Sequence, residues 1–194
     1  MIDLQNRSDF IKLAVLFESG LIVVAVAVGW IFDLEPPVRC EWSIADIGWG
    51  VLFAIPMFGL FLLGWRFPFG LLRPMKQFLL ESLGPPLAAC RWHDLAAIAA
   101  VAGVSEELLF RGVLYPLTGR WISGVLFGLA HCITPLYALL AGLAGLALGD
   151  LMERTNNLLA PMVAHGVYDF LVFVAVARSV RQQPPILQEP HETG

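Results

Sequence analysis

The sequence predicts an all-α fold, a polytopic transmembrane bundle of about six helical spans. Hydrophobic residues make up 58% of the 194 residues, charged residues only 14%, and the mean hydropathy is +0.73. Such values are typical of helical membrane proteins rather than of soluble domains. The apolar residues fall into runs long enough to cross about 30 Å of hydrocarbon. We therefore expect one integral-membrane domain over residues 1–178 and a polar, disordered tail over residues 179–194.

The composition also argues against several classes of function. The formal net charge of −4 leaves no basic patch, and no stripe of Lys or Arg alternates with aromatic residues, so nucleic acid is not an expected partner. The three cysteines, Cys40, Cys90 and Cys132, form no CxxC pair. This spacing argues against a disulfide framework and against a thiolate zinc site.

The first two spans are expected over residues 11–32 and 44–65. The first apolar run has no small-residue cleavage site after a short apolar core, so it is interpreted as an anchored span rather than a signal peptide. Glu18 lies inside it, either as a carboxylate near the helix end that reaches an interface or a polar neighbour, or as part of an internal polar cavity. Pro56 is expected to kink the second span.

A mixed basic and apolar segment precedes the third span. Residues 71–83 have the composition of an interfacial helix lying along the membrane surface between the second and third spans, and a simple connecting loop is the alternative. Asp94 is the expected N-cap of the third span, which runs to about Tyr115. Pro116 and Gly119 are expected to end it.

Three further spans complete the expected bundle. The fourth starts near Trp121 and stops at Pro135, the fifth covers residues 136–152, and the sixth covers residues 158–177. Gly145 and Gly149 are spaced for close helix contact.

With the N-terminus in the cytoplasm, eight basic residues fall on the inside and three on the outside, so both termini are predicted to be cytoplasmic. The inside residues are Arg7, Lys12, Arg66, Arg73, Lys76, Arg91, Arg178 and Arg181, and the outside residues are Arg39, Arg120 and Arg154.

Uncommon ionisable residues lie inside the third, fourth and sixth predicted spans. Each costs roughly 2.5–3.5 kcal/mol at membrane depth, so we expect them to share one polar cavity. Glu107 and Arg111 are four residues apart and can form an ion pair, whereas Glu106 is turned about 100° away and has no partner in its own helix. The remaining members of the set are His131 and the pair His165 and Asp169, which share one helix face.

A carboxylate and two imidazoles in a hydrated cavity can hydrolyse a peptide bond without a covalent intermediate. The carboxylate takes a proton from water that an imidazole orients, and a second imidazole with an Asx side chain donates to the oxygen of the tetrahedral intermediate. The same residue types also form catalytic zinc sites. The residues therefore leave open whether water is activated directly or by zinc bound to Glu106, His131, His165 and Asp169.

Three motifs in this set resemble those of the CPBP intramembrane proteases, which include the type II CAAX prenyl endopeptidases and the bacterial bacteriocin-processing and self-immunity proteins. The motifs are Glu106-Glu107-x-x-x-Arg111, Phe127-x-x-x-His131 and His165-x-x-x-Asp169, and the resemblance covers a catalytic core of about residues 95–177. It implies a glutamic-type mechanism in which Glu106 and His131 activate water and His165 and Asp169 stabilise the oxyanion. Many members are nevertheless labelled metalloproteases.

Some motif residues are interpreted as structural, and the last motif position raises a question of protonation. Glu107 and Arg111 are interpreted as a structural pair, and Phe127 either packs or lines the cavity. The resemblance implies Asn at the last motif position in the eukaryotic CAAX-processing branch and Asx more broadly, and this chain has Asp169. An ionised Asp169 cannot donate to an oxyanion, so it must be protonated, orient His165 or bind a metal.

The expected function is therefore that of an intramembrane endopeptidase, with a membrane-associated peptide or protein as substrate and the lipid bilayer as surroundings. The alternatives are a non-cleaving membrane binder, such as an immunity or scaffold protein using the same cavity, and a proton-coupled carrier, which the lack of a repeat disfavours. Motifs of other intramembrane proteases are absent, among them Gly-x-Ser-x-Gly and His-Glu-x-x-His.

Overall fold

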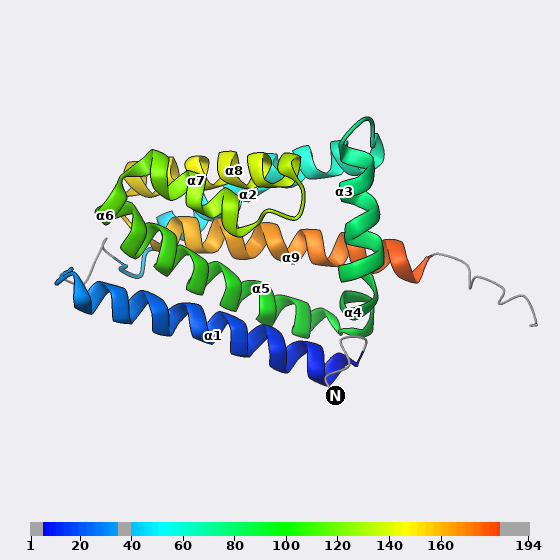
Figure 1. Cartoon of the computed structure of the whole chain (residues 1–194), viewed down its shortest axis with the longest axis horizontal. Helices are drawn as coiled ribbons and strands as arrows, with labels where there is room; N and C mark the ends of the chain where they lie inside the picture. The colour runs from blue at the N-terminus through cyan, green and yellow to red at the C-terminus, as the bar shows by residue number, and fades with distance from the viewer. Residues whose placement is uncertain (1–5, 35–39, 183–194) are drawn as a thin grey trace, which may run out of the picture.

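A computed structural model describes residues 6–34 and 40–182, and within these residues the chain is helical with no strand. The helix α5 (Trp92–Glu107) packs between α1 (Arg7–Ile31) and α9 (Leu159–Arg181), and α2 (Ile44–Arg66) packs against α9. The long helices run roughly along one direction (Figure 1). The expected all-α bundle is thus confirmed, although α9 continues to Arg181 where the sequence predicts a tail from residue 179. Residues 183–194 of that predicted tail lie outside the described residues.

In the described part of the chain, four helices are long and apolar enough to cross a membrane, namely α1, α2, α8 (Pro135–Thr155) and α9. In the most apolar windows of α1 and α2 only 11% of the residues are buried. Their apolar side chains, such as Leu16 and Leu60, therefore face outward, where lipid would cover them. This is an integral membrane protein that crosses the bilayer several times. The second span continues as a helix through Pro56 to Arg66.

The third predicted span is one helical stretch that changes geometry part-way. After Glu107, α5 passes into a π-helical segment, η2 (Leu108–Leu114), and then into α6 (Tyr115–Thr118). Pro116 does not end the stretch, because it lies in the first turn of α6, where its missing N–H is tolerated. Gly119, with φ +82°, ends it in a conformation that favours glycine.

The start of this stretch also differs from the expectation. Arg91 is the N-cap of α5, and Asp94 lies three residues later, in the first turn. The Asp94 carboxylate accepts a hydrogen bond of 2.7 Å from the backbone N–H of Arg91, as the acidic partner of a capping box does. It also accepts two hydrogen bonds, of 2.6 and 2.7 Å, from the Arg7 guanidinium. Asp94 is thus not the N-cap but the residue that ties α5 to the start of α1.

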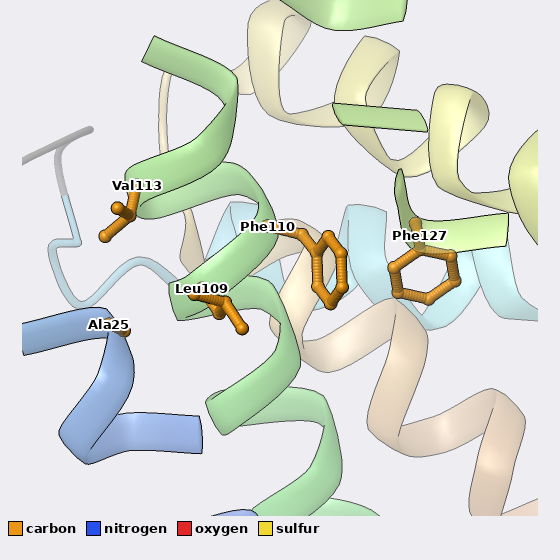
Figure 2. Close-up of a cluster of buried hydrophobic side chains, with 5 residues drawn as sticks. All are labelled: Ala25, Leu109, Phe110, Val113 and Phe127. Carbon is orange, nitrogen blue, oxygen red and sulfur yellow. The ribbon is translucent and has the colours of Figure 1, made fainter. Parts of the chain in front are cut away.

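Glu18 provides a second tie between α1 and α5. It lies near the middle of α1 rather than near its end, and it is buried. The hydroxyl of Ser105, which precedes Glu106 in the chain, donates a hydrogen bond of 2.5 Å to Glu18 Oε2. The polar neighbour expected for Glu18 is therefore Ser105. Farther along, Ala25 of α1 packs against Leu109 and Val113 of η2 (Figure 2).

The segment after α2 is helical rather than a loop. It comprises α3 (Leu72–Phe78), the π-helical η1 (Leu79–Leu83) and α4 (Gly84–Ala89). In Figure 1 this segment runs across one end of the bundle, roughly perpendicular to α1, α5 and α9. A helix in this orientation lies along the membrane surface when the bundle spans the bilayer, as the mixed basic and apolar sequence predicts.

The fourth predicted span is too short to cross the bilayer. The helix α7 (Arg120–Ala130) has 11 residues and is therefore about 16 Å long, roughly half of the hydrocarbon thickness. It forms a hairpin with α8, and the turn of this hairpin stops short of the end where α3 and α4 lie (Figure 1). A Cβ atom on Gly128 would lie 2.5 Å from the carbonyl oxygen of Ala138, so glycine permits the two helix backbones to meet.

Two glycines of α8 have a different role from the expected helix–helix contact. A Cβ on Gly145 would lie 3.2 Å from both the Arg111 guanidinium and the Phe127 ring of α7, and a Cβ on Gly149 would lie 3.3 Å from the Tyr115 ring. Gly145 thus makes room for side chains of η2 and α7, and Gly149 makes room for a side chain of α6. The atoms nearest to both positions belong to side chains rather than to a neighbouring backbone.

The closest approach of α5 and α9 depends on Gly103. A Cβ atom there would lie 2.7 Å from the backbone nitrogen of Gly166 and 2.8 Å from the carbonyl oxygen of Met162. These backbone atoms cannot rotate away as a side chain could. Gly103 precedes Glu106 by less than one turn, and Gly166 follows His165. The crossing therefore sets the separation between the carboxylates of α5 and the imidazole of α9.

We predict that Gly103→Ala lowers the free energy of unfolding by about 1–3 kcal/mol, because the added methyl forces α5 and α9 apart. The measurement is the midpoint of thermal unfolding of the purified protein in detergent. Gly59→Ala is the matched control, since nothing lies within 4 Å of a Cβ at that position of α2. Equal midpoints for the two variants would contradict the role given to the crossing.

Candidate active site

The two adjacent glutamates lie where α5 meets η2. Glu106 has 9% of its surface exposed and Glu107 none. Because the two residues are consecutive, their side chains point in directions about 100° apart. They therefore enter different surroundings within the same buried region. The π-helical geometry begins directly after them, and such segments often occur at functional sites.

Glu107 and Arg111 form the ion pair that their spacing predicts. Arg111 Nη1 donates a hydrogen bond of 2.8 Å to Glu107 Oε1, and Arg111 has only 1% of its surface exposed. Its Nη2 donates another, of 2.8 Å, to the carbonyl oxygen of Gly145 in α8. The guanidinium also lies over the Phe127 ring of α7, 4.5 Å from its centroid. Arg111 thus holds η2, α7 and α8 together around a neutralised carboxylate.

Glu107 has a second partner, which its place in the sequence does not reveal. Its Oε1 lies 2.8 Å from Nδ1 of His165 in α9. Since a carboxylate only accepts hydrogen bonds, His165 Nδ1 carries the hydrogen in this contact. The Glu107 carboxylate therefore orients the imidazole of His165 as well as balancing the charge of Arg111.

His131 lies just beyond the last residue of α7, at its C-cap. Its Nδ1 is 2.9 Å from the carbonyl oxygen of Phe127 and donates to it. The imidazole stacks on the Phe127 ring with centroids 4.4 Å apart. Phe127 is buried and in turn meets Phe110 of η2 edge to face at 4.9 Å, as the facing rings in Figure 2 show. Phe127 therefore both packs in the core and fixes the ring of His131, so that Nε2 faces Glu106.

The three motifs converge on one oxygen atom. Glu106 Oε2 lies 3.3 Å from His131 Nε2 and 3.9 Å from His165 Nε2. It is buried and has no hydrogen-bond partner among the described residues. The structure thus brings a carboxylate oxygen and two imidazole nitrogens from α5, α9 and the end of α7 into one small space, as the sequence predicts.

Asp169 lies one helical turn beyond His165 in α9, and its Oδ2 is 3.4 Å from His165 Nε2. The two nitrogens of His165 therefore both face carboxylates, those of Glu107 and Asp169. No group of three or more His, Cys, Asp or Glu side chains within residues 6–34 and 40–182 is arranged to hold a metal ion. The Nε2 atoms of both histidines face carboxylate oxygens, and the described side chains form no preformed metal site.

An apolar cavity of about 390 Å³ opens beside these residues, a size common for ligand sites. His131 and His165 lie on its wall, and most of the remaining lining is apolar and comes from α2, α3 and α8. The polar exceptions include Lys76, Tyr137 and Tyr168. Examples of the apolar lining are Leu60, Phe61, Met75, Leu140 and Ala144.

Sequence reasoning missed the two cavity tyrosines. A single tyrosine in an apolar run resembles a membrane-interface anchor, and no spacing links Tyr137 to the three motifs. The one available signal is its position two residues after Pro135 at the start of a helix, close in sequence to His131. Tyr168, by contrast, is next to Asp169 of the third motif, although its place on the cavity wall follows only from the fold.

Comparison with known proteins supports the resemblance found in the motifs. Residues 88–171 match the model of a family described as Type II CAAX prenyl endopeptidase Rce1-like. The matched segment contains all three motifs and thus supports a membrane protease at the level of general class. No curated protein and no solved structure matched the chain.

We predict that Arg111→Ala destabilises the protein by roughly 3–5 kcal/mol, because it leaves the buried Glu107 carboxylate without its cation. The measurements are the midpoint of thermal unfolding and the amount of protein in the membrane. Arg154→Ala is the matched control, since Arg154 forms an ion pair with the same spacing and a distance of 2.7 Å to Asp150 but has 74% of its side chain exposed. That pair should contribute less than about 1 kcal/mol. Similar losses in the two variants would refute the prediction.

Proposed function

We propose that this chain is an intramembrane endopeptidase of the CAAX type that hydrolyses a peptide bond of a membrane-associated protein or peptide by a glutamic mechanism. The observation that carries the proposal is the position of Glu106 Oε2, buried, without a hydrogen-bond partner among the described residues and close to two imidazole nitrogens. A carboxylate placed in this way is suited to accept a proton from water. The family match over residues 88–171 supports the same reaction class.

In the proposed reaction, Glu106 and His131 activate the attacking water. Because His131 Nδ1 donates to the Phe127 carbonyl, its neutral form has a lone pair on Nε2, which faces Glu106. A water molecule between them donates one hydrogen to Glu106 and the other to His131. Its oxygen lone pair is then directed at the carbonyl carbon of the substrate. Because the water and both catalytic groups are held in place, the attack on the carbonyl carbon has a lower entropic cost.

The remaining steps transfer the proton and break the bond. Glu106 takes a proton as the water oxygen bonds to the carbonyl carbon, and the carbonyl electron pair moves to the oxygen of the tetrahedral intermediate. Glu106 then gives the proton to the amide nitrogen, the oxyanion electron pair re-forms the carbonyl as the C–N bond breaks, and a carboxylic acid and an amine leave. His165, oriented by Glu107 and flanked by Asp169, acts electrostatically on the intermediate. No step in this sequence passes through a metal ion.

The proposed substrate is an apolar segment, because the cavity next to the two histidines is lined mainly by apolar side chains. The name of the matched family adds prenylated C-terminal peptides as the first substrates to test.

We further propose that both termini are cytoplasmic. The basic residues Arg7, at the start of α1, and Arg181, at the end of α9, lie at the same end of the bundle, since Arg7 pairs with Asp94 and Arg181 bonds to the nearby Cys90 carbonyl.

We predict that Glu106→Gln lowers kcat by about 10²-fold or more, because an amide cannot accept the proton of the attacking water. The assay uses the full chain in liposomes and an internally quenched peptide that ends in a farnesylated cysteine and three further residues. Glu153→Gln is the control, since Glu153 lies at the exposed end of α8. Cleavage by Glu106→Gln at the wild-type rate would exclude this mechanism. If the variant folds and keeps its function in cells without cleaving, the protein is instead a non-cleaving binder.

We also predict that a zinc chelator leaves the cleavage rate within about twofold of its starting value, because the proposed mechanism activates water with Glu106 and His131 and needs no metal ion. The rate is measured in the same liposomes after prolonged incubation with a membrane-permeant chelator, alongside elemental analysis of the purified protein. Loss of cleavage that added zinc restores would assign the activated water to a metal ion and overturn this prediction.

A further inference from the structure

The proposed reaction needs a hydrogen-bond donor for the negative oxygen of the tetrahedral intermediate. Such a donor has to face the cavity and be free to bind substrate, and removing one typically costs 10²–10³ in kcat. A side chain of the three motifs could serve only if it had a hydrogen that no other group already accepts. The inference that follows rests on the proposed peptide hydrolysis.

None of the motif side chains has an uncommitted donor directed into the cavity. His131 donates from Nδ1 to the Phe127 carbonyl, and its Nε2 faces Glu106. His165 donates from Nδ1 to Glu107, and its Nε2 faces Asp169 at 3.4 Å. An ionised Asp169 has no hydrogen to donate. A donor that is free to bind the substrate oxygen therefore has to come from outside the motifs.

Tyr137 meets the requirements. It lies in the first turn of α8, where its backbone N–H donates 3.1 Å to Oγ1 of Thr134, the N-cap. Its side chain lines the cavity together with His131 and His165, and its ring centroid is 6.4 Å from that of His131. The hydroxyl makes no hydrogen bond to any residue in the described part of the chain. A tyrosine hydroxyl has an ordinary pKa of about 10 and therefore keeps its hydrogen at neutral pH.

We propose that the Tyr137 hydroxyl is the oxyanion donor of this active site. A polar group facing an apolar cavity is costly while it has no partner, and the substrate carbonyl oxygen supplies one. The hydroxyl donates a hydrogen bond that strengthens as negative charge develops on that oxygen, and it keeps its proton throughout. No co-reactant is needed, and the carboxylate of Asp169 is left to act on His165.

Tyr168 provides a matched comparison within the same cavity. It too lines the cavity, and its hydroxyl makes no hydrogen bond to the described residues. Of the two tyrosines, Tyr137 has the ring contact with His131. Tyr168 lies next to Asp169 in the chain. Removing each hydroxyl in turn therefore separates a catalytic donor from a merely polar cavity wall.

The test measures kcat and KM for Tyr137→Phe and Tyr168→Phe in liposomes with the quenched farnesylated peptide. We expect Tyr137→Phe to lower kcat by about 10–10³-fold with KM within about twofold, and Tyr168→Phe to lower kcat by less than about threefold. The inhibition constant of a phosphinate peptide, which mimics the tetrahedral intermediate, should rise for Tyr137→Phe by the same factor as kcat/KM falls. That of the cleaved product should not change.

Several outcomes would overturn the inference. These are a Tyr137→Phe enzyme with kcat within threefold of wild type, equal losses in the two variants, or a loss confined to KM. If Tyr137→Phe fails to fold, 3-fluorotyrosine at position 137 retains the shape and changes the acidity of the hydroxyl, and an unchanged kcat would count against the donor role. An inactive wild type, or an active Glu106→Gln, would instead refute the proposed hydrolysis itself.

Discussion

The structure depends on one buried ion pair, that of Glu107 and Arg111. Two adjacent carboxylates in an apolar bundle repel each other and lose their hydration, so one of them needs a cation within hydrogen-bonding distance. Arg111 supplies it from the same helical stretch, with almost no surface exposed. Its remaining contacts, with the Gly145 carbonyl and the Phe127 ring, bring α7 and α8 to the pair. The charge that neutralises Glu107 thereby also fixes the position of the short helix that ends at His131.

The same pair divides the work between the two glutamates. Glu107 is bonded on one oxygen to both Arg111 and His165, so it holds a histidine ring in place. Glu106, one residue earlier, is turned away from Arg111 and lies close to the Nε2 atoms of both imidazoles. In the proposed mechanism the first glutamate exchanges protons while the second keeps its charge. The consecutive positions make this possible, because a turn of about 100° separates two environments only a few ångströms apart.

The sequence predicts the helices and the membership of the candidate site well, and for physical reasons. Long apolar runs can be satisfied in a membrane only as helices, and costly ionisable groups on separate helices are expected to share one cavity. Relations within one helix, such as that of Glu107 with Arg111, follow from spacing alone. The roles of Glu106, His131, His165 and Asp169 in catalysis remain predictions.

Features that depend on tertiary contacts could not be predicted. The bond between Glu107 and His165 joins residues 58 positions apart, and no local pattern encodes it. The π-helical segment η2 has a sequence that an α-helix would also accept. Ser123 of α7 donates a hydrogen bond of 2.8 Å to the Phe110 carbonyl within η2. This contact is recognisable only in the folded protein. The sequence predicts a longer helix than α7, because the residues after Ala130 are still apolar although the helix ends there.

The shortness of α7 has a consequence for the surrounding lipid. The helix starts at a polar end of the bundle, where Arg120 pairs with Asp150 and Glu153, and after 11 residues it gives way to the irregular backbone of residues 131–134. Irregular backbone is not tolerated against hydrocarbon tails, so acyl chains cannot pack evenly along this side of the protein. We therefore expect the bilayer to thin, or to admit headgroups and water, next to the candidate site. Lipids with short tails should match this side of the protein best.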